Sequence, residues 1–126
     1  MKIGITCYPT HGGSGVIASE LALGLANRGH EIHIVSYTTP FRLRSFHKNV
    51  CIHEVEVASY PLFKFPPYAL GLATKLVEVT EEYNLDLIHA HYAVPHAASA
   101  YLAKQILRSD KLKIVLLHYT EPILHW

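Results

Sequence analysis

The chain has 126 residues and a formal net charge of +1, and half of its residues are hydrophobic. This length favours one domain, and the apolar content predicts a globular protein rather than a disordered one. The small net charge gives no case for nucleic acid as a partner, and no apolar run is long enough to span a membrane. With no secretory signal in view, we expect a cytoplasmic protein whose Cys7 and Cys51 are reduced thiols in or near the core.

The hydrophobic pattern alternates between short strand-like segments and longer helical ones. In chain order we expect a strand at 2–7, a helix at 13–28, strands at 31–37 and 50–57, a helix at 68–83, a strand at 85–89, a helix at 95–107 and a strand at 113–117. Gly29 ends the first helix as a C′ glycine, Pro66-Pro67 and Asn84 bracket the second, and Pro95 opens the third. The alternation predicts an α/β, Rossmann-like parallel sheet with helices on both faces.

We expect residues 1–126 to form a single lobe of an incomplete architecture. The fifth predicted strand is followed at once by residues 118–126, which offer no helix to cover the sheet. The chain is therefore expected to be a fragment, or to associate with something else. An uncovered sheet face and an exposed edge strand would favour a partner or a homo-oligomer.

The loop before the first helix is rich in glycine. Its residues Gly13-Ser14-Gly15-Val16-Ile17-Ala18 match the pattern G-x-G-x-x-A, which can bring the N–H groups of a helix N-terminus to an anion. A dinucleotide cofactor is disfavoured because the second strand ends in Ser36-Tyr37, without the acidic residue that would hold a ribose. The lysine of a P-loop is also missing. A nucleotide or anion site and a plain tight turn both stay open.

Ligands of such sheets bind beyond the carboxyl ends of the strands, which directs attention to four loops. These loops are 10–14, 38–48, 89–96 and the segment from 118 onward. His89 and His91 are two residues apart at a strand end, so their side chains should share a face. A metal site there lacks a nearby carboxylate or thiolate, so we expect no metal and favour a ligand-lining role for His91 and Tyr92. Six other histidines read as surface or filler residues: His11, His30, His33, His47, His53 and His125.

Two further segments combine aromatic residues with other features. Residues 41–48 are basic and aromatic, and residues 60–68 are aromatic and rich in proline. Together they could touch an anionic membrane surface or line a pocket for an anionic acceptor. Loops that simply pack over the sheet explain them equally well.

Several stretches carry a resemblance to a known family. They are Lys2-Ile3-Gly4-Ile5-Thr6-Cys7-Tyr8-Pro9, the glycine loop, Arg28-Gly29-His30-Glu31, Pro40-Phe41-Arg42-Leu43, Tyr60-Pro61-Leu62-Phe63 and His89-Ala90-His91-Tyr92-Ala93-Val94-Pro95-His96. Over about residues 2 to 118 the chain resembles the N-terminal lobe of a GT-B glycosyltransferase of the retaining, GT4-type group. Within that group it is most similar to the transferases that make glucosaminyl-malate for bacillithiol biosynthesis.

The resemblance implies transfer of N-acetylglucosamine from UDP-GlcNAc to the hydroxyl of L-malate, without a metal or a cofactor. In that family the N-terminal lobe binds mainly the acceptor. By position, Gly13, Ser14 and Gly15 would meet the diphosphate or the acceptor through backbone N–H groups. Tyr92 would donate a hydrogen bond to a malate carboxylate.

The same resemblance makes His118 the candidate catalytic residue, with Thr120 beside the transferred sugar and the acceptor. Here the sequence departs from the family, because His118 is followed by Tyr119 where the family has glycine. The lobe that would hold the sugar nucleotide is absent from the 126 residues, so we expect the chain alone to be inactive. Two alternatives stay open: a GT4-type transferase with a lipid or sugar acceptor, and a non-catalytic Rossmann-like binding module.

Overall fold

The computed structural model describes residues 1–9, 14–56 and 68–117. Its strands are β1 (Lys2–Thr6), β2 (Glu31–Ser36), β3 (Val50–Glu54), β4 (Leu87–His91) and β5 (Lys113–Leu117). Its helices are α1 (Ser14–Asn27), α2 (Tyr68–Tyr83) and α3 (Ala98–Leu107), with short helical turns at Phe41–Leu43 and Ala93–Ala97. All strand pairs are parallel, in the order β3-β2-β1-β4-β5, which confirms the predicted α/β sheet.

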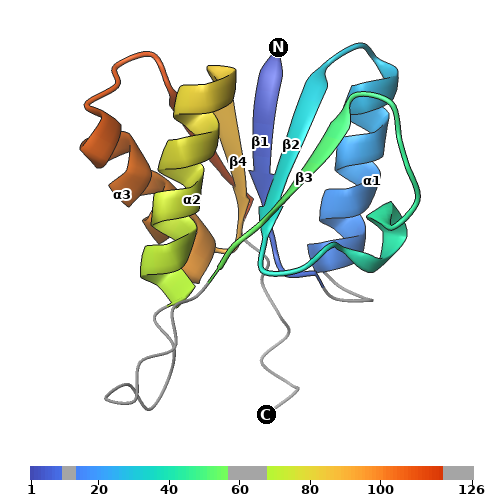
Figure 1. Ribbon diagram of the computed structural model, residues 1–126, viewed down its shortest axis with the longest axis horizontal. Helices are drawn as coiled ribbons and strands as arrows, with labels where there is room; N and C mark the ends of the chain where they lie inside the picture. Colours follow the sequence, from blue (N-terminus) through green and yellow to red (C-terminus); the bar gives the residue numbers. More distant parts are fainter. Residues whose placement is uncertain (10–13, 57–67, 118–126) are drawn as a thin grey trace.

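The sheet is covered on both faces, with α1 on one side and α2 and α3 on the other (Figure 1). Isoleucines of β1 and β2 pack against alanines of α1, among them Ile5, Ile34 and Ala22, each with no exposed surface. On the opposite face Leu72 and Leu76 of α2 are equally buried and belong to a second cluster that includes β4 and α3. Removal of this apolar surface from water is the main force that holds the layers together.

Every strand runs in the same direction, so all carboxyl ends lie at one edge of the sheet, where α1 and α2 begin (Figure 1). β1 is the central strand, and its Ile5 pairs with Ile34 on one side and His89 on the other. The loops that follow β1, β2 and β4 therefore emerge side by side. This edge is where a ligand of an open parallel sheet is expected to bind.

Three predicted elements have boundaries that differ by two residues or more: β3 ends at Glu54 rather than at 57, β4 covers Leu87–His91 rather than 85–89, and α3 begins later than predicted. The fourth strand begins at Leu87 rather than Leu85, because Leu85 is buried in the core and the pairing of β4 with β1 starts at Leu87. The third helix begins at Ala98 rather than Pro95, which lies in the turn Ala93–Ala97, where Val94 has extended backbone angles. His91 is consequently the last residue of β4, and Tyr92 is the first residue beyond it.

The end of α1 follows the sequence prediction. Gly29 has φ = +93°, its N–H donates to the carbonyl of Ala26, and the N–H of His30 donates to the carbonyl of Leu25. This pair of hydrogen bonds defines a Schellman cap, whose left-handed residue is normally glycine. Gly24, by contrast, lies inside α1, and apart from the adjoining helix backbone no heavy atom stands within 4 Å of the place where a Cβ would be.

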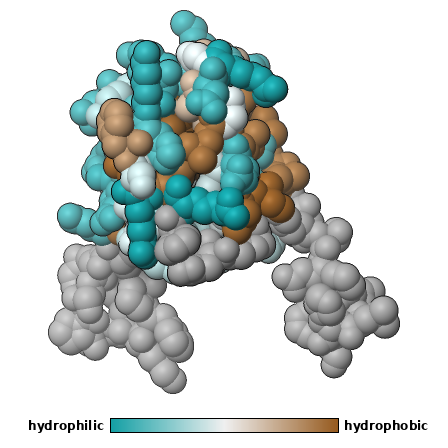
Figure 2. Space-filling model, turned by 90° about the vertical axis from the view of Figure 1, so that its right-hand side faces the viewer, coloured by the Kyte–Doolittle hydropathy of each residue, from teal (hydrophilic) through white to brown (hydrophobic). Residues whose placement is uncertain are grey.

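The outer strand β5 carries apolar side chains that water reaches. Val115 and Leu116 are 42% and 46% exposed, although Ile114 packs against the core beneath α2 and α3. Seen from the side of β3 and α1, the surface is mixed, with apolar side chains between hydrophilic ones (Figure 2). Within the described residues, no helix combines the length and hydropathy needed to cross a membrane. Both Cys7 and Cys51 are free thiols, the first buried and the second exposed.

Alanine at the two glycines of the α1 region should change stability in opposite directions. Gly29→Ala should lower the free energy of unfolding by about 1 kcal/mol, because an L-residue is strained at positive φ. Gly24→Ala should raise it by roughly 0.5–1 kcal/mol, since alanine is the better helix former and the site has room. Urea unfolding followed by circular dichroism measures both. Equal effects of the two substitutions would show that Gly29 does not adopt this backbone conformation in solution.

Candidate functional site at the carboxyl edge

Aromatic residues and histidines line the edge where the strands end. Tyr8, two residues beyond β1, packs edge-on against the ring of His96, with centroids 4.5 Å apart. Its ring also lies 5.9 Å from that of Tyr92, which follows β4. The loop after β1 is tied to β2, because the hydroxyl of Ser36 donates to the carbonyl of Cys7 at 3.0 Å. Residues far apart in sequence thus form one wall.

Tyr92 is held at this wall by its backbone. It has φ = +77°, which is uncommon for a residue with a side chain. Its N–H donates to the carbonyl of Leu117 on β5 at 3.0 Å, and its carbonyl accepts from the N–H of Ala97 at 3.1 Å. A strained backbone of this kind persists only where the surrounding structure holds it in place. Such residues are concentrated at functional sites.

The histidines at the edge are buried and electrically neutral at physiological pH. His91 and His96 have no exposed surface. Burial lowers the pKa of His91 to about 4, with smaller contributions from His89 and His96. Burial also lowers the pKa of His96 to about 4, against a smaller opposing effect of the backbone at His91 and Cys7. The rings of His89 and His91 lie 4.8 Å apart, which confirms that the two side chains share a face.

The start of α2 brings a further tyrosine to the edge. The ring of Tyr68 lies 5.6 Å from that of Tyr37, which follows β2, and 6.4 Å from that of His96. Burial raises the pKa of Tyr68 to about 12, with smaller effects of Cys7, Tyr8 and Tyr37. The Tyr68 hydroxyl therefore stays protonated and able to donate a hydrogen bond throughout the physiological range.

The first turn of α1 supplies backbone N–H groups at the same edge. The helix begins at Ser14, runs for 14 residues and carries no acidic residue in its first turn. Its positive dipole end is therefore not neutralised by a carboxylate of that turn. The hydroxyl of Ser19 donates to the carbonyl of Gly15 one turn earlier, at 2.7 Å.

The structure brings part of the predicted site together. Ser14 and Gly15 open α1, and Tyr92 lies at the end of β4, as expected. Gly13, His118 and Thr120 lie outside the described residues. Sequence reasoning missed Tyr8 and Tyr37, although each stands within two residues of a strand's carboxyl end, a signal that could have found them, and it included Tyr68 only as the last residue of the segment 60–68. The group of described residues with metal-ligand spacing is elsewhere, on β2 and β3.

The buried histidines predict a loss of stability in acid. The folded protein binds a proton at His91 or His96 only near pH 4, whereas the unfolded chain binds one near pH 6.5. The unfolded state thus holds more protons between these values, and stability falls as the pH drops from 6.5 towards 4. Each tenfold difference in proton affinity corresponds to about 1.4 kcal/mol. His96→Gln should flatten this dependence in urea unfolding at successive pH values; an unchanged slope would contradict it.

Comparison with known proteins agrees with this architecture. The family described as Glycosyltransferase Family 4 matches residues 11–126. N-acetyl-alpha-D-glucosaminyl L-malate synthase of Bacillus anthracis is 53% identical over 122 residues, which are 96% of this chain and 32% of that protein. The chain therefore spans about a third of the length of this relative.

Solved structures share the fold at lower identity. A glycosyltransferase from Rickettsia africae aligns with a TM-score of 0.67 and 23% identity, over 98% of this chain and 31% of that one. MurG of Acinetobacter baumannii aligns with a TM-score of 0.65 and 12% identity, over 93% of this chain and 35% of that one. The match to the family model covers most of the sequence, and the sheet carries its polar edge where such a fold binds ligands. The chain belongs to glycosyltransferase family 4.

Proposed function

We propose that this chain is the N-terminal, acceptor-binding lobe of a retaining glycosyltransferase that moves N-acetylglucosamine from UDP-GlcNAc to the hydroxyl of L-malate. The observation that carries the proposal is the 53% identity, over 96% of this chain, to a relative whose name gives glucosaminyl malate as its product. The proposed place of L-malate is the carboxyl edge of the sheet.

The chemistry of that edge suits a small dicarboxylate. The first turn of α1 offers backbone N–H groups and carries no acidic residue of its own at the positive dipole end. Tyr92 lies just beyond β4 with the ring of Tyr8 next to it, and we propose that its hydroxyl donates to a malate carboxylate. His91 and His96 are neutral, so they can form hydrogen bonds without adding a buried charge.

The binding site for the donor UDP-GlcNAc requires residues beyond these 126. The relative is about three times as long, and we place the pocket for the uridine and the cations for the departing diphosphate in a second lobe. The chain alone should then be inactive. His118 and Thr120 are proposed to lie beside the transferred sugar, with no metal at the reacting centre. Both substrates are small and water-soluble, in keeping with a cytoplasmic enzyme.

A chimaera tests the proposed function directly. The matched residues of this chain replace the corresponding segment of the Bacillus anthracis synthase, and UDP release from UDP-GlcNAc is measured with and without L-malate. Malate-dependent release is expected from the chimaera and not from the chain alone. A folded chimaera that binds UDP-GlcNAc but releases no UDP in response to malate would overturn the acceptor assignment. Glycosyl transfer by the chain alone would overturn the proposal that a second lobe is required.

Tyr92→Phe in the chimaera tests the acceptor contact. Removal of a hydrogen bond to a carboxylate costs about 1.5–3 kcal/mol, so the KM for malate should rise roughly 10- to 100-fold. The KM for UDP-GlcNAc should change little, because the donor is held by the other lobe. The control is Tyr101→Phe on α3, where Tyr101 is 62% exposed. Equal effects on both KM values would remove Tyr92 from the acceptor site.

A lipid acceptor is the second candidate, favoured by one surface feature. Phe46 is 92% exposed and stands between the exposed residues Arg44 and Lys48. An aromatic side chain flanked by cations suits the interface of an anionic membrane. Co-sedimentation with anionic vesicles that is lost in Phe46→Ser would support this acceptor class. Absence of binding to such vesicles would remove it.

A further inference from the structure

A second group of polar side chains lies on the α2 face of the sheet, away from the carboxyl edge. Glu31 and His33 come from β2, and Cys51 and His53 come from β3. His33 pairs with Cys51 in the register of the two strands, and His53 lies two residues further along the same face. Of the two sequence-based descriptions of His33, surface or filler residue, the structure excludes the first, because His33 is 1% exposed and both of its ring nitrogens have partners.

The hydrogen bonds fix where the protons of this group lie. Nε2 of His33 is 2.7 Å from a carboxylate oxygen of Glu31, and this contact lowers the pKa of Glu31. An ionised carboxylate only accepts, so Nε2 of His33 carries the proton. In the neutral ring the lone pair is then on Nδ1, which lies 2.9 Å from Nε2 of His53. Two imidazole nitrogens therefore face each other across a single proton.

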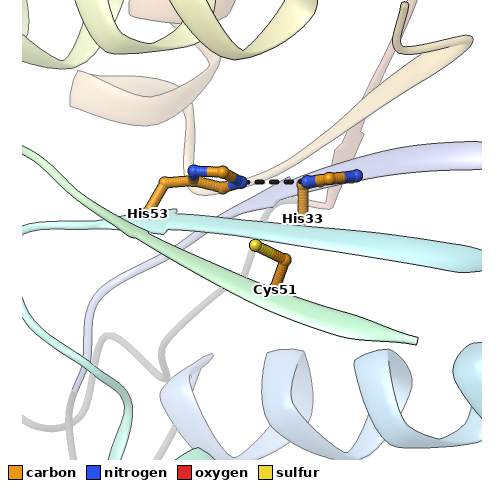
Figure 3. Close-up of side chains that lie close together, drawn as sticks. All are labelled: His33, Cys51 and His53. Atoms are coloured by element: carbon orange, nitrogen blue, oxygen red, sulfur yellow. Dashed lines mark hydrogen bonds between the residues drawn. The ribbon is translucent and has the colours of Figure 1, made fainter. Parts of the chain in front are cut away.

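The thiol of Cys51 completes a set of three ligand atoms. Figure 3 shows its sulfur directed from β3 toward the two imidazole rings. The sulfur and the facing nitrogens of His33 and His53 all lie within 4.8 Å of one another. Burial lowers the pKa of His53, assisted by His33 and Lys75 and opposed by Glu82. A lowered pKa favours the neutral ring, which is the form of imidazole that binds metals.

These distances can be compared with those of a zinc site. Zinc binds nitrogen at 2.0–2.1 Å and thiolate sulfur at about 2.3 Å, so tetrahedral ligand atoms lie about 3.3–3.6 Å apart. The two nitrogens, now 2.9 Å apart, would separate by roughly half an ångström. The sulfur lies within 4.8 Å of both nitrogens, so it would move inward by no more than about 1.5 Å.

We propose that His33, Cys51 and His53 form a binding site for a transition-metal cation of the Zn²⁺ class. The ion takes the place of the proton between the two imidazoles and bonds to Nδ1 of His33, Nε2 of His53 and the sulfur of Cys51. The proton of His53 moves to its other ring nitrogen, and the thiol proton leaves to solvent. A donor set of two imidazoles and one thiolate favours the binding of zinc over that of magnesium or calcium.

Glu31 and the adjoining cavity fit the same assignment. A carboxylate that accepts the second N–H of a metal-bound imidazole is the usual outer-shell partner, because it fixes the tautomer and strengthens the ligand. Glu31 holds this position on His33 before any metal arrives. A cavity of about 230 Å³, lined in part by His33, Cys51 and Tyr83, gives an ion access and leaves room for water as the fourth ligand.

The metal site is separate from the carboxyl edge. The ring of Tyr83, at the end of α2, lies 4.2 Å from that of His33, whereas Tyr68, at the start of the same helix, belongs to the edge. The 16 residues of α2 span about 24 Å. The ion therefore does not touch the proposed acceptor; it clamps the edge strand β3 to β2 and stabilises the fold.

Two optical measurements on the untagged 126-residue chain test this proposal. Cobalt(II) titration should give one site with a thiolate-to-metal charge-transfer band, which an equivalent of Zn²⁺ removes. A disulfide reagent such as DTNB should label one thiol, Cys51, because Cys7 is buried and burial raises its pKa to about 12. Zn²⁺ should protect Cys51 from this reaction, and EDTA should restore the reaction.

Variants separate the site from adventitious binding. Cys51→Ser should abolish the charge-transfer band, and His53→Gln should weaken cobalt and zinc affinity at least 100-fold. Glu31→Gln, which changes the hydrogen-bond partner of His33 and no metal ligand, should weaken cobalt and zinc affinity about 10-fold. His30→Gln is the matched control and should change nothing, because His30 lies outside the group. Circular dichroism confirms that each variant is folded. Absence of a thiolate band in the parent chain, or equal zinc affinity of the parent and His53→Gln, would overturn the proposal.

Discussion

The rest of the structure depends on the parallel pairing of β1 with a strand on each side. β1 is buried except at its first residue, with Ile3 and Ile5 packed on the α1 face of the sheet and Gly4 against Leu85 and Ile88 on the other. The register that pairs Ile5 with both Ile34 and His89 also decides which residues emerge at the carboxyl edge. Tyr8 and Tyr92 meet only because β1 and β4 end at the same level. Packing in the core thereby determines how Tyr8, Tyr92 and His96 are arranged at the carboxyl edge.

The two histidine groups show how environment gives one side chain different chemistry. His91 and His96 are enclosed by aromatic rings and backbone, and burial keeps them neutral. His33 is just as buried, but it lies between a carboxylate and a second imidazole, so its protons have fixed places. The first arrangement suits hydrogen bonding to a ligand without a buried cation. The second presents a lone pair to any cation that can displace a proton.

The elements with strong local signals were predicted well. The bounds of α2 and β5 agree with the sequence analysis, because Pro66-Pro67 and Asn84 mark the ends of the helix and the last strand is short and apolar. β4 was misplaced because Leu85 extends the apolar run, and only pairing with β1 shows where the ladder begins. Likewise, no local signal separates Pro95 in a turn from Pro95 in a first helical turn.

The candidate sites were harder to predict, because they are made by contacts between distant residues. Tyr92 was identified from its place after a strand and from family resemblance, whereas its contact with Tyr8 depends on the order of the strands. His33 and His53 looked unremarkable because they come from different strands, His33 between Ile32 and Ile34 and His53 between Ile52 and Glu54. Only the register of β2 with β3 places them and Cys51 on one face. Period-two alternation shows which residues share a face within a strand, but not which strands are neighbours.

The exposed apolar side chains of β5 have a consequence for how the chain behaves in solution. Val115, Leu116 and Leu117 lie on an edge strand whose outer backbone groups face no neighbouring strand of the described sheet. Lys111 and Lys113, both exposed, stand at its start, and charges of this kind discourage strand-to-strand association. These two lysines oppose strand-to-strand association only at the amino end of β5. Anything that covers the remaining apolar stretch binds the folded form alone and draws the folding equilibrium toward it. The apparent melting temperature of this domain therefore depends on the concentration and affinity of any partner that covers β5, as well as on its own sequence.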